Sequence, residues 1–194
     1  MNYKVHIEQY FEMVASALKN ININELIKAI EIIESTVANE KAIYVMGNGG
    51  SASTASHIQS DLSNTVGQLK GKRMNVSCLS DSIATITAIA NDYSYDLIYQ
   101  KQLYGRLKQG DLIIAVSGSG NSQNVINAAE YAKSEQANII AMTGYNGGKL
   151  KEIAGFNLHV PVDNMQISED IHLLFNHVIT YILNYSNKDI QHDC

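Results

Sequence analysis

The chain has 194 residues, 45% of them hydrophobic, and a formal net charge of −5. This length suits one domain with a sizeable core, so we expect residues 1–194 to form a single domain. The negative charge disfavours a broad nucleic-acid surface. No apolar run approaches the roughly 20 residues that span a bilayer, and the first residues lack the apolar core of a signal peptide. We therefore expect a cytoplasmic protein that binds neither nucleic acid nor membrane.

The spacing of apolar residues predicts alternating helices and strands. In chain order, we expect helices over 3–19 and 23–37, a strand over 42–46, a helix ending near 62, a strand over 74–79, helices over 82–90 and 95–107, a strand over 112–116, a helix over 125–132, a strand over 138–142, a helix over 149–154, a strand over 157–160 and a helix over 168–185. Asn24 is the expected N-cap of the second helix. Strands that are apolar on both faces indicate a parallel sheet inside a three-layer α/β sandwich.

The first two helices have little sheet of their own to cover. Residues 1–39 are therefore expected to form a helical hairpin whose apolar face packs on a second subunit.

A Gly/Ser loop, Ser117-Gly-Ser-Gly-Asn-Ser122, joins the 112–116 strand to the next helix. Backbone N–H groups and the helix dipole make such a loop an anion site, and its three hydroxyls can donate to phosphate oxygens. The loop has no lysine, so it is not a Walker A motif, and a sugar monophosphate held by neutral donors is the expected ligand. The alternative is an ordinary turn in which Ser122 caps the helix.

A second loop, Gly47-Asn-Gly-Gly-Ser51, follows the first strand. Position 52 is alanine, so the loop fails the G-x-G-x-x-G spacing and a nicotinamide cofactor is disfavoured. The loop can still offer N–H groups and the Ser51 hydroxyl to a sugar or phosphate; a tight turn with positive φ is an equal alternative. Both loops follow strands of a parallel sheet, so they are expected at the same edge.

Titratable side chains occur in pairs on two of the expected helices. His57 and Asp61 are four residues apart and share a helix face, and Glu169 and His177, eight apart, can face one cavity. Such groups could bind a divalent metal or act as acid and base, although each pair could equally be structural. The Asn91–Asp92 dipeptide could cap a helix or bind sugar hydroxyls.

Taken as a set, these motifs resemble the SIS (sugar isomerase) domain family, and within it the phosphoheptose isomerases. The resemblance extends over most of the chain and includes Thr143-Gly144 and Gly147-Gly148. It implies a five-stranded, parallel, flavodoxin-like sheet and a homotetramer with sites between subunits. It also implies that the substrate contacts come from both loops and from the 91–92 and 169 positions: Asn48, Gly49, Ser51, Asn91, Asp92, Ser117, Gly118, Ser119, Asn121, Ser122 and Glu169.

The resemblance further implies one zinc ion per subunit, held by four side chains: His57, Asp61, Glu169 and His177. It makes Asp61 the candidate base and His177 its acid–base partner. Asp61 stands where the family usually has Glu, Glu169 where it has Gln, and Gly118 where it has Thr. A carboxylate that binds the metal tightly cannot also be a free base, and the sequence leaves this conflict open.

The function implied by the resemblance is an aldose–ketose isomerase. It would convert sedoheptulose 7-phosphate, through an enediol, into D-glycero-D-manno-heptose 7-phosphate, a precursor of lipopolysaccharide or capsule heptose. One alternative is a non-catalytic SIS protein that binds the replication initiator DnaA. The segment 87–92 resembles the SIS proteins of that kind. Another is an isomerase or sensor for a different sugar phosphate.

Overall fold

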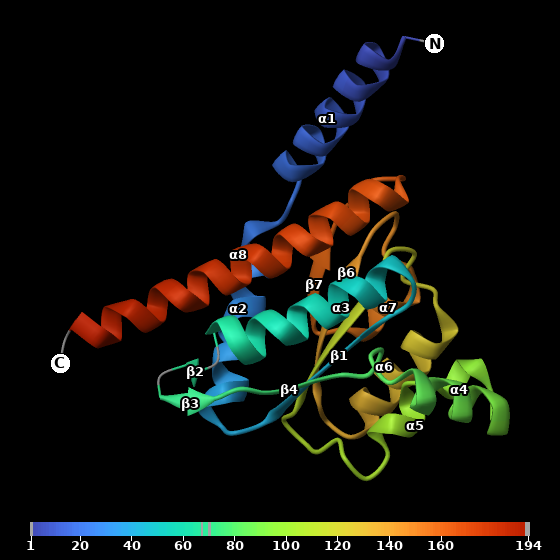
Figure 1. Cartoon of the computed structure of the whole chain (residues 1–194), viewed down its shortest axis with the longest axis vertical. Coiled ribbons are helices and arrows are strands. Elements are labelled where there is room, and N and C mark those ends of the chain that lie inside the picture. The colour runs from blue at the N-terminus through green and yellow to red at the C-terminus, as the bar shows by residue number, and fades with distance from the viewer. Residues whose placement is uncertain (1, 67, 70, 193–194) are drawn as a thin grey trace.

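The fold is a single parallel sheet between two helical layers (Figure 1). The computed structural model describes residues 2–66, 68–69 and 71–192. The sheet order is β4-β1-β5-β6-β7, with strands Asn75–Cys78, Ala42–Gly47, Leu112–Ser117, Asn138–Thr143 and Phe156–His159. Counted among themselves along the chain, these strands follow the flavodoxin-like order 2-1-3-4-5, so the strand order reverses between β1 and β5. The expected three-layer α/β sandwich is confirmed.

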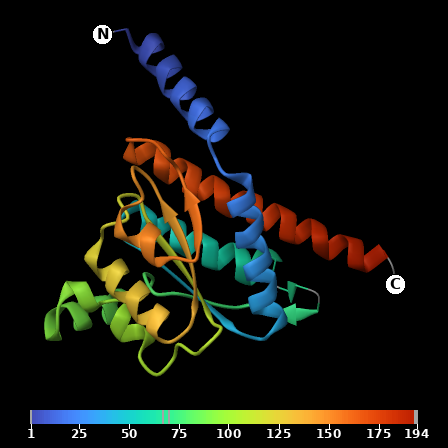
Figure 2. The same ribbon diagram turned by 180° about the vertical axis from the view of Figure 1, so that it is seen from behind.

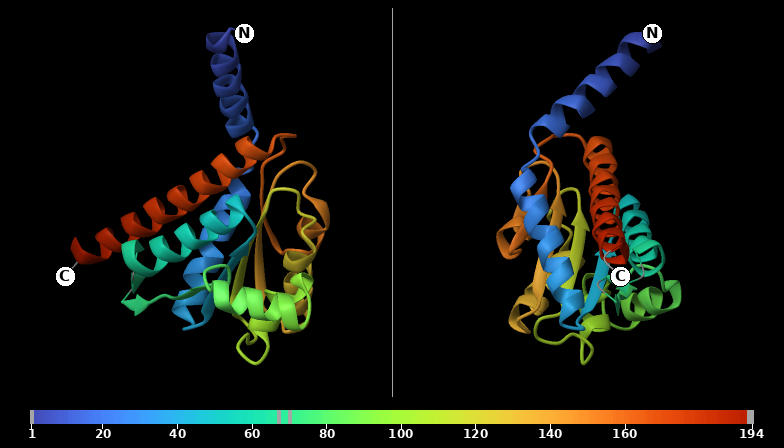
Figure 3. Two further views of the ribbon diagram at one scale, coloured as in Figure 1. Left: turned by 45° about the vertical axis from the view of Figure 1, so that its right-hand side comes forward. Right: turned by 90° about the vertical axis from the view of Figure 1, so that its left-hand side faces the viewer.

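The central strands β1, β5 and β6 are apolar on both sides because each side faces a different helical layer. In β1, Ile43 and Val45 join one core cluster, whereas Tyr44 and Met46 join the other. The first cluster lies under α2 (Ile23–Ala38), α3 (Gly50–Ser60) and α8 (Met165–His192), the layer seen in the right-hand view of Figure 3. The second lies under α5 (Gln100–Leu103), α6 (Gln123–Ser134) and α7 (Gly148–Ile153), with α4 (Ile83–Asp92) at its rim.

The prediction of one helix over 95–107 is wrong. The structure has a short 3-10 turn, η2 (Tyr95–Leu97), followed by the four-residue α5, and Gly105 then adopts a φ of 70°. Ile98, Leu103 and Leu107 are buried, so the apolar spacing reflects core contacts made by a turning chain. The N-cap of α2 is also corrected, because Asn22, not Asn24, is the capping residue and its side chain accepts from the Asn24 N–H.

Other boundaries differ where periodicity carries little signal. A short antiparallel pair, β2 (Gln68–Leu69) and β3 (Lys72–Arg73), was not expected, because two residues show no alternation. The helix after β1 continues from α3 into a π-helix, η1 (Asp61–Val66). The last helix begins at Met165, three residues early, because the Asn164 side chain accepts from the Ile167 N–H.

The first helix, α1 (Tyr3–Lys19), projects away from the body, as Figures 1 and 2 show. Ala17 is its one buried residue among those described, and Ile7 and Phe11 are exposed. The Tyr10 hydroxyl donates to Asp170 Oδ2 of α8 across 2.7 Å. The expected hairpin is therefore open, with α1 and α2 diverging. None of the helices in the described ranges is both long and apolar enough to cross a bilayer.

His172 is a fully buried imidazole on the inner face of α8. Neither ring nitrogen has a hydrogen-bond partner. Burial, with a smaller contribution from the neighbouring His159, lowers the pKa of His172 to about 4, and the Thr143 backbone opposes this shift only in part. The ring is therefore neutral at pH 7 and packs as an apolar group.

His172 should make the protein less stable in acid. Its folded pKa lies below the ordinary value of about 6.5, so the unfolded chain binds more protons as pH falls from 6.5 to 4. The free energy of unfolding should drop by about 2 kcal/mol from this group alone between pH 7 and pH 5. In urea unfolding, His172→Leu should flatten this dependence, whereas His6→Gln, on exposed α1, should not. An unchanged pH slope in His172→Leu would contradict this assignment.

Candidate functional site

The serine loop lies where β5 ends and α6 begins. Ser117 is buried at the end of β5, and its hydroxyl donates to Ser122 Oγ across 3.3 Å. The Ser119 Oγ accepts from the Asn121 N–H at 3.2 Å. Ser122 occupies the N-cap position of α6, but its side chain makes no capping hydrogen bond. The interpretation of Ser122 as an ordinary side-chain cap is therefore wrong, and the hydroxyls gather at a helix N-terminus instead.

The glycine loop after β1 faces the same edge. Gly47 pairs with Val116 of β5, so the loops that follow these two strands are neighbours at the point where the strand order reverses. Gly49 is exposed with a φ of 55°, as the tight-turn alternative expected, and it precedes the first turn of α3. Ser51 lies in that turn. The N-termini of α3 and α6 thus meet at one place that favours an anion.

Asn48 anchors the glycine loop through its side-chain amide. Its Oδ1 accepts from the Tyr95 hydroxyl at 3.1 Å and from Asn124 Nδ2 at 3.0 Å, and its Nδ2 donates to Asn124 Oδ1 at 2.8 Å. The Tyr99 hydroxyl contacts both Asn48 Oδ1 and the Gly47 carbonyl oxygen. The sequence did not reveal these partners, because the tyrosines matched core spacing. Only the second Nδ2 hydrogen of Asn48 is left for a ligand.

Two histidines and an aspartate converge between α3 and α8. The rings of His57 and His177 lie 5.1 Å apart at 73°, and His57 Nε2 is 3.4 Å from Asp61 Oδ1. One ligand atom from each of the three residues lies within 4.8 Å of the other two. The contact between α3 and α8 brings these residues together although His177 lies more than a hundred positions beyond His57.

A buried amide orients the Asp61 carboxylate. Asn176, adjacent to His177, donates from Nδ2 to Asp61 Oδ2 across 2.7 Å. Asp61 is also the first residue of the π-helix η1, a helix irregularity often found at functional sites. Sequence reasoning missed Asn176, although a polar residue three positions before Ile179 and seven before Leu183, on the apolar stripe of α8, was an available signal.

Glu169 does not join this cluster. Eight residues before His177 correspond to about 12 Å along the helix axis, a separation that the shared-face argument ignored. The Glu169 carboxylate instead lies over the start of α3, where a Cβ added to Gly50 would meet its oxygens at 2.6 and 2.7 Å. In this structure His57, Asp61 and His177 lie together without Glu169, whose carboxylate lies beside the glycine loop.

The other residues expected to contact the substrate lie on α4 and in the serine loop. Asn91 and Asp92 are exposed in the last turn of α4, where the Asn91 amide donates to the Asp92 carboxylate at 3.0 Å. Gly118 is buried against Met165, so an added Cβ would meet the sulfur at 2.5 Å. Asn121 is exposed, and its Oδ1 accepts from the Lys149 N–H.

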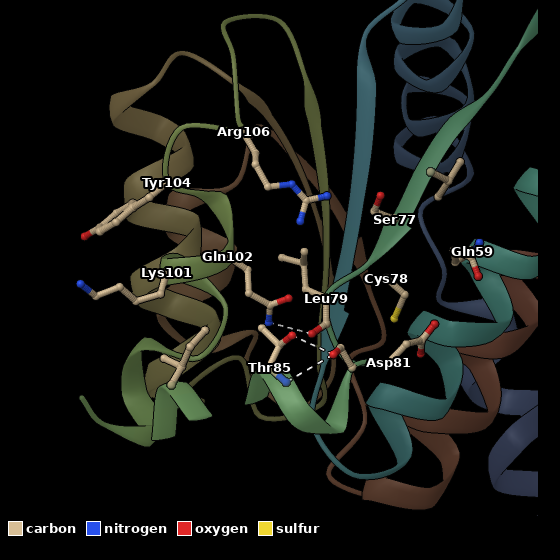
Figure 4. A pocket seen from close by; sticks show the side chains of 13 residues that line it. Gln59, Ser77, Cys78, Leu79, Asp81, Thr85, Lys101, Gln102, Tyr104 and Arg106 are labelled. Atoms are coloured by element: carbon tan, nitrogen blue, oxygen red, sulfur yellow. Dashed lines mark hydrogen bonds between the residues drawn. The ribbon is translucent and has the colours of Figure 1, made fainter. Parts of the chain in front are cut away.

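A separate cavity of about 640 Å³ opens beside the edge strand β4. Figure 4 shows Gln102 and Arg106 on one side and Cys78 and Asp81 on the other. Burial raises the pKa of the Cys78 thiol to about 12, so the sulfur stays protonated and is a poor nucleophile. The lining contains none of the serine-loop or histidine-cluster residues.

The histidine cluster suits a divalent metal chemically. Two imidazole nitrogens and one carboxylate oxygen are a donor set that zinc accepts, and three protein ligands are the number found in catalytic zinc sites. The partial exposure of the His57 side chain, 43%, leaves the cluster open to a substrate. The residues present therefore fit the expected ion.

Comparisons with known proteins agree with this architecture. The SIS domain family matches residues 9–144. A probable phosphoheptose isomerase from Thermoplasma acidophilum is 36% identical over 177 residues, covering 91% of this chain and 97% of the relative. The phosphoheptose isomerase of Aliarcobacter butzleri is 36% identical over 175 residues, covering 89% and 90% of the two chains. The solved structure of phosphoheptose isomerase GmhA from Neisseria gonorrhoeae has a TM-score of 0.87 at 26% identity and covers 95% of this chain and 100% of its own. The chain belongs to the SIS domain family, and it aligns along most of its length with phosphoheptose isomerases.

Proposed function

We propose that this chain is a phosphoheptose isomerase that converts sedoheptulose 7-phosphate into D-glycero-D-manno-heptose 7-phosphate. The observation that carries the proposal is the convergence of His57, Asp61 and His177 between α8 and α3, the helix that begins at the glycine loop. The names of the relatives, at 36% identity over most of the chain, support this substrate. The product would supply heptose for lipopolysaccharide or capsule. We expect the enzyme in the cytoplasm, because the negative charge of phosphorylated sugars keeps them inside the cell.

The phosphate would bind at the N-termini of α3 and α6. Ser51, Ser117, Ser119 and Ser122 supply hydroxyl donors, and the two helix dipoles favour the negative charge. The sugar would then extend along α3 toward His57, which lies six residues, or about 9 Å of helix, beyond Ser51. Further sugar contacts come from polar and glycine positions around this path: Asn48, Gly49, Asn91, Asp92, Gly118, Asn121 and Glu169.

Asp61 and His177 would perform the proton transfers. In the proposed sequence, Asp61 removes a proton from the carbon next to the carbonyl, while His177 donates a proton to the carbonyl oxygen, giving the enediol. The proton held by Asp61 then returns to the neighbouring carbon, and His177 recovers its proton from the hydroxyl that becomes the new carbonyl. The retained histidines and carboxylate favour this enzyme over the non-catalytic DnaA-binding alternative.

His57, Asp61 and His177 would hold one zinc ion per subunit. When bound, the ion supplies Lewis-acid polarisation of the sugar's oxygen atoms. Oδ1 of Asp61 lies 3.4 Å from His57 Nε2 and Oδ2 accepts from Asn176, so the two carboxylate oxygens have different surroundings. Glu169 serves the substrate in this proposal rather than the metal.

We also propose a homotetramer, built partly through α1. Ile7 and Phe11 are 53% and 66% exposed on a helix that extends away from its own subunit. A second unpartnered surface is α4, which buries none of its residues and exposes Ile83. Apolar side chains gathered on such elements are typical of surfaces that another subunit covers.

Substitution of the acid–base pair tests the reaction. With sedoheptulose 7-phosphate and zinc, the unmodified protein should form the aldose phosphate, followed by NMR. Asp61→Asn and His177→Gln should each lower kcat by about 10²–10⁴-fold, because each removes a proton-transfer group. Asp163→Asn, an exposed carboxylate outside the site, is the control. No turnover by the zinc-loaded chain, together with capture of purified DnaA, would favour the alternative.

Zinc affinity tests the ligand set independently of turnover. Competition with a chromophoric chelator should give one zinc per chain. His57→Ala and His177→Ala should each weaken binding by at least about 100-fold, whereas Glu169→Gln should change it by less than about threefold. A loss in Glu169→Gln equal to that in His57→Ala would restore the four-residue set.

Substitutions on the exposed face of α1 test the proposed tetramer. Light scattering coupled to size exclusion should give the mass of four chains for the unmodified protein. Ile7→Glu combined with Phe11→Glu should dissociate it, because burying either charge in an apolar interface is costly. Glu12→Gln on the same helix should leave the mass unchanged. A tetramer that survives the double substitution would exclude α1 from the interface.

A further inference from the structure

Asn176 is a polar residue in a stripe that otherwise serves the core. It is 1% exposed, and Ile179 and Leu183, three and seven positions further along α8, are 3% and 0% exposed. An aliphatic side chain at 176 would pack in this stripe without losing hydrogen bonds to water, whereas an amide must find a partner inside the protein. The identity of this residue therefore needs a reason beyond packing.

The partner of Asn176 is the Asp61 carboxylate. The Asn176 Nδ2 donates to Asp61 Oδ2 at 2.7 Å, while the other carboxylate oxygen, Asp61 Oδ1, lies 3.4 Å from His57 Nε2. A carboxylate turns easily about its terminal torsion, so without a fixed donor either oxygen could face the imidazoles. A hydrogen bond to a charged acceptor is short and strong, and here its donor sits on a well-packed helix.

We propose that Asn176 is a positioning residue that fixes the Asp61 carboxylate and presents Oδ1 to His57 and His177. The inference rests on the proposed role of Asp61. Asn176 acts on the reaction and on metal binding only through that carboxylate. Partners that orient a ligand in this way commonly change metal affinity or activity by 10- to 100-fold when removed.

Asn176→Leu tests the proposal, since leucine keeps the branched shape of the side chain and removes the donor. We expect kcat to fall about 10- to 100-fold with KM within about twofold, and the zinc affinity of the metal-free chain to fall by a similar factor. The melting temperature should fall by only a few degrees, because the Asp61 carboxylate loses one donor but its side chain, 15% exposed, can still reach water. Thr180→Val is the matched control: Thr180 is four residues further along α8 and 7% exposed, and its buried hydroxyl has no partner.

The dependence on Asp61 separates this inference from the proposed function. In Asp61→Asn, adding Asn176→Leu should change kcat and zinc affinity by less than about twofold, because the group that Asn176 orients is already gone. If Asp61→Asn is inactive but Asn176→Leu keeps both kcat and zinc affinity, the inference is wrong and the proposed function stands. If Asp61→Asn is fully active, the proposed role of Asp61 fails first. Asn176→Ala replaces the leucine variant in the same comparisons if that variant does not fold.

Discussion

The packing of α8 against α3 is the contact on which the whole site depends. Ile58 and Leu62, from α3 and η1, share one buried cluster with Ile171, Phe175 and Ile179 of α8. Each fully buried side chain of this kind contributes roughly 1.5–3 kcal/mol. The half-exposed His57–Asp61 pair contributes at most about 1 kcal/mol, as exposed ion pairs do. Apolar packing therefore positions the polar cluster, and the cluster does not hold the helices together.

One helix, α3, connects the two halves of the site. Its first turn carries Ser51 beside the serine loop, and His57 lies near its end. The end that favours an anion and the end that carries His57 are thus fixed relative to each other by a rigid element rather than by a loop. The neutral hydroxyl donors at the first end also suit a chain whose net charge is negative.

Much of this arrangement could be predicted from the sequence because parallel strands impose it. Strands apolar on both faces required two helical layers, and loops after parallel strands had to share an edge. The segment 95–107 could not be predicted, because Ile98, Leu103 and Leu107 reach the core from a turning chain with helix-like spacing. Asn176 was missed since its importance depends on Asp61, a residue distant in sequence. Glu169 lies apart from His57, Asp61 and His177 in this structure, because eight residues along a helix correspond to about 12 Å of its axis.

The glycines of the serine loop also limit how this site can change. Gly120 has a φ of 65°, and an added Cβ would lie 1.9 Å from the Gly147 carbonyl oxygen. The Gly120 carbonyl also accepts from the Leu150 N–H, and the Gly118 carbonyl from the Gly144 N–H, so the loops after β5 and β6 interlock. A larger residue at 120 would force the two loops apart. Evolution or engineering of this loop must therefore act at other positions and leave the contact between Gly120 and Gly147 intact.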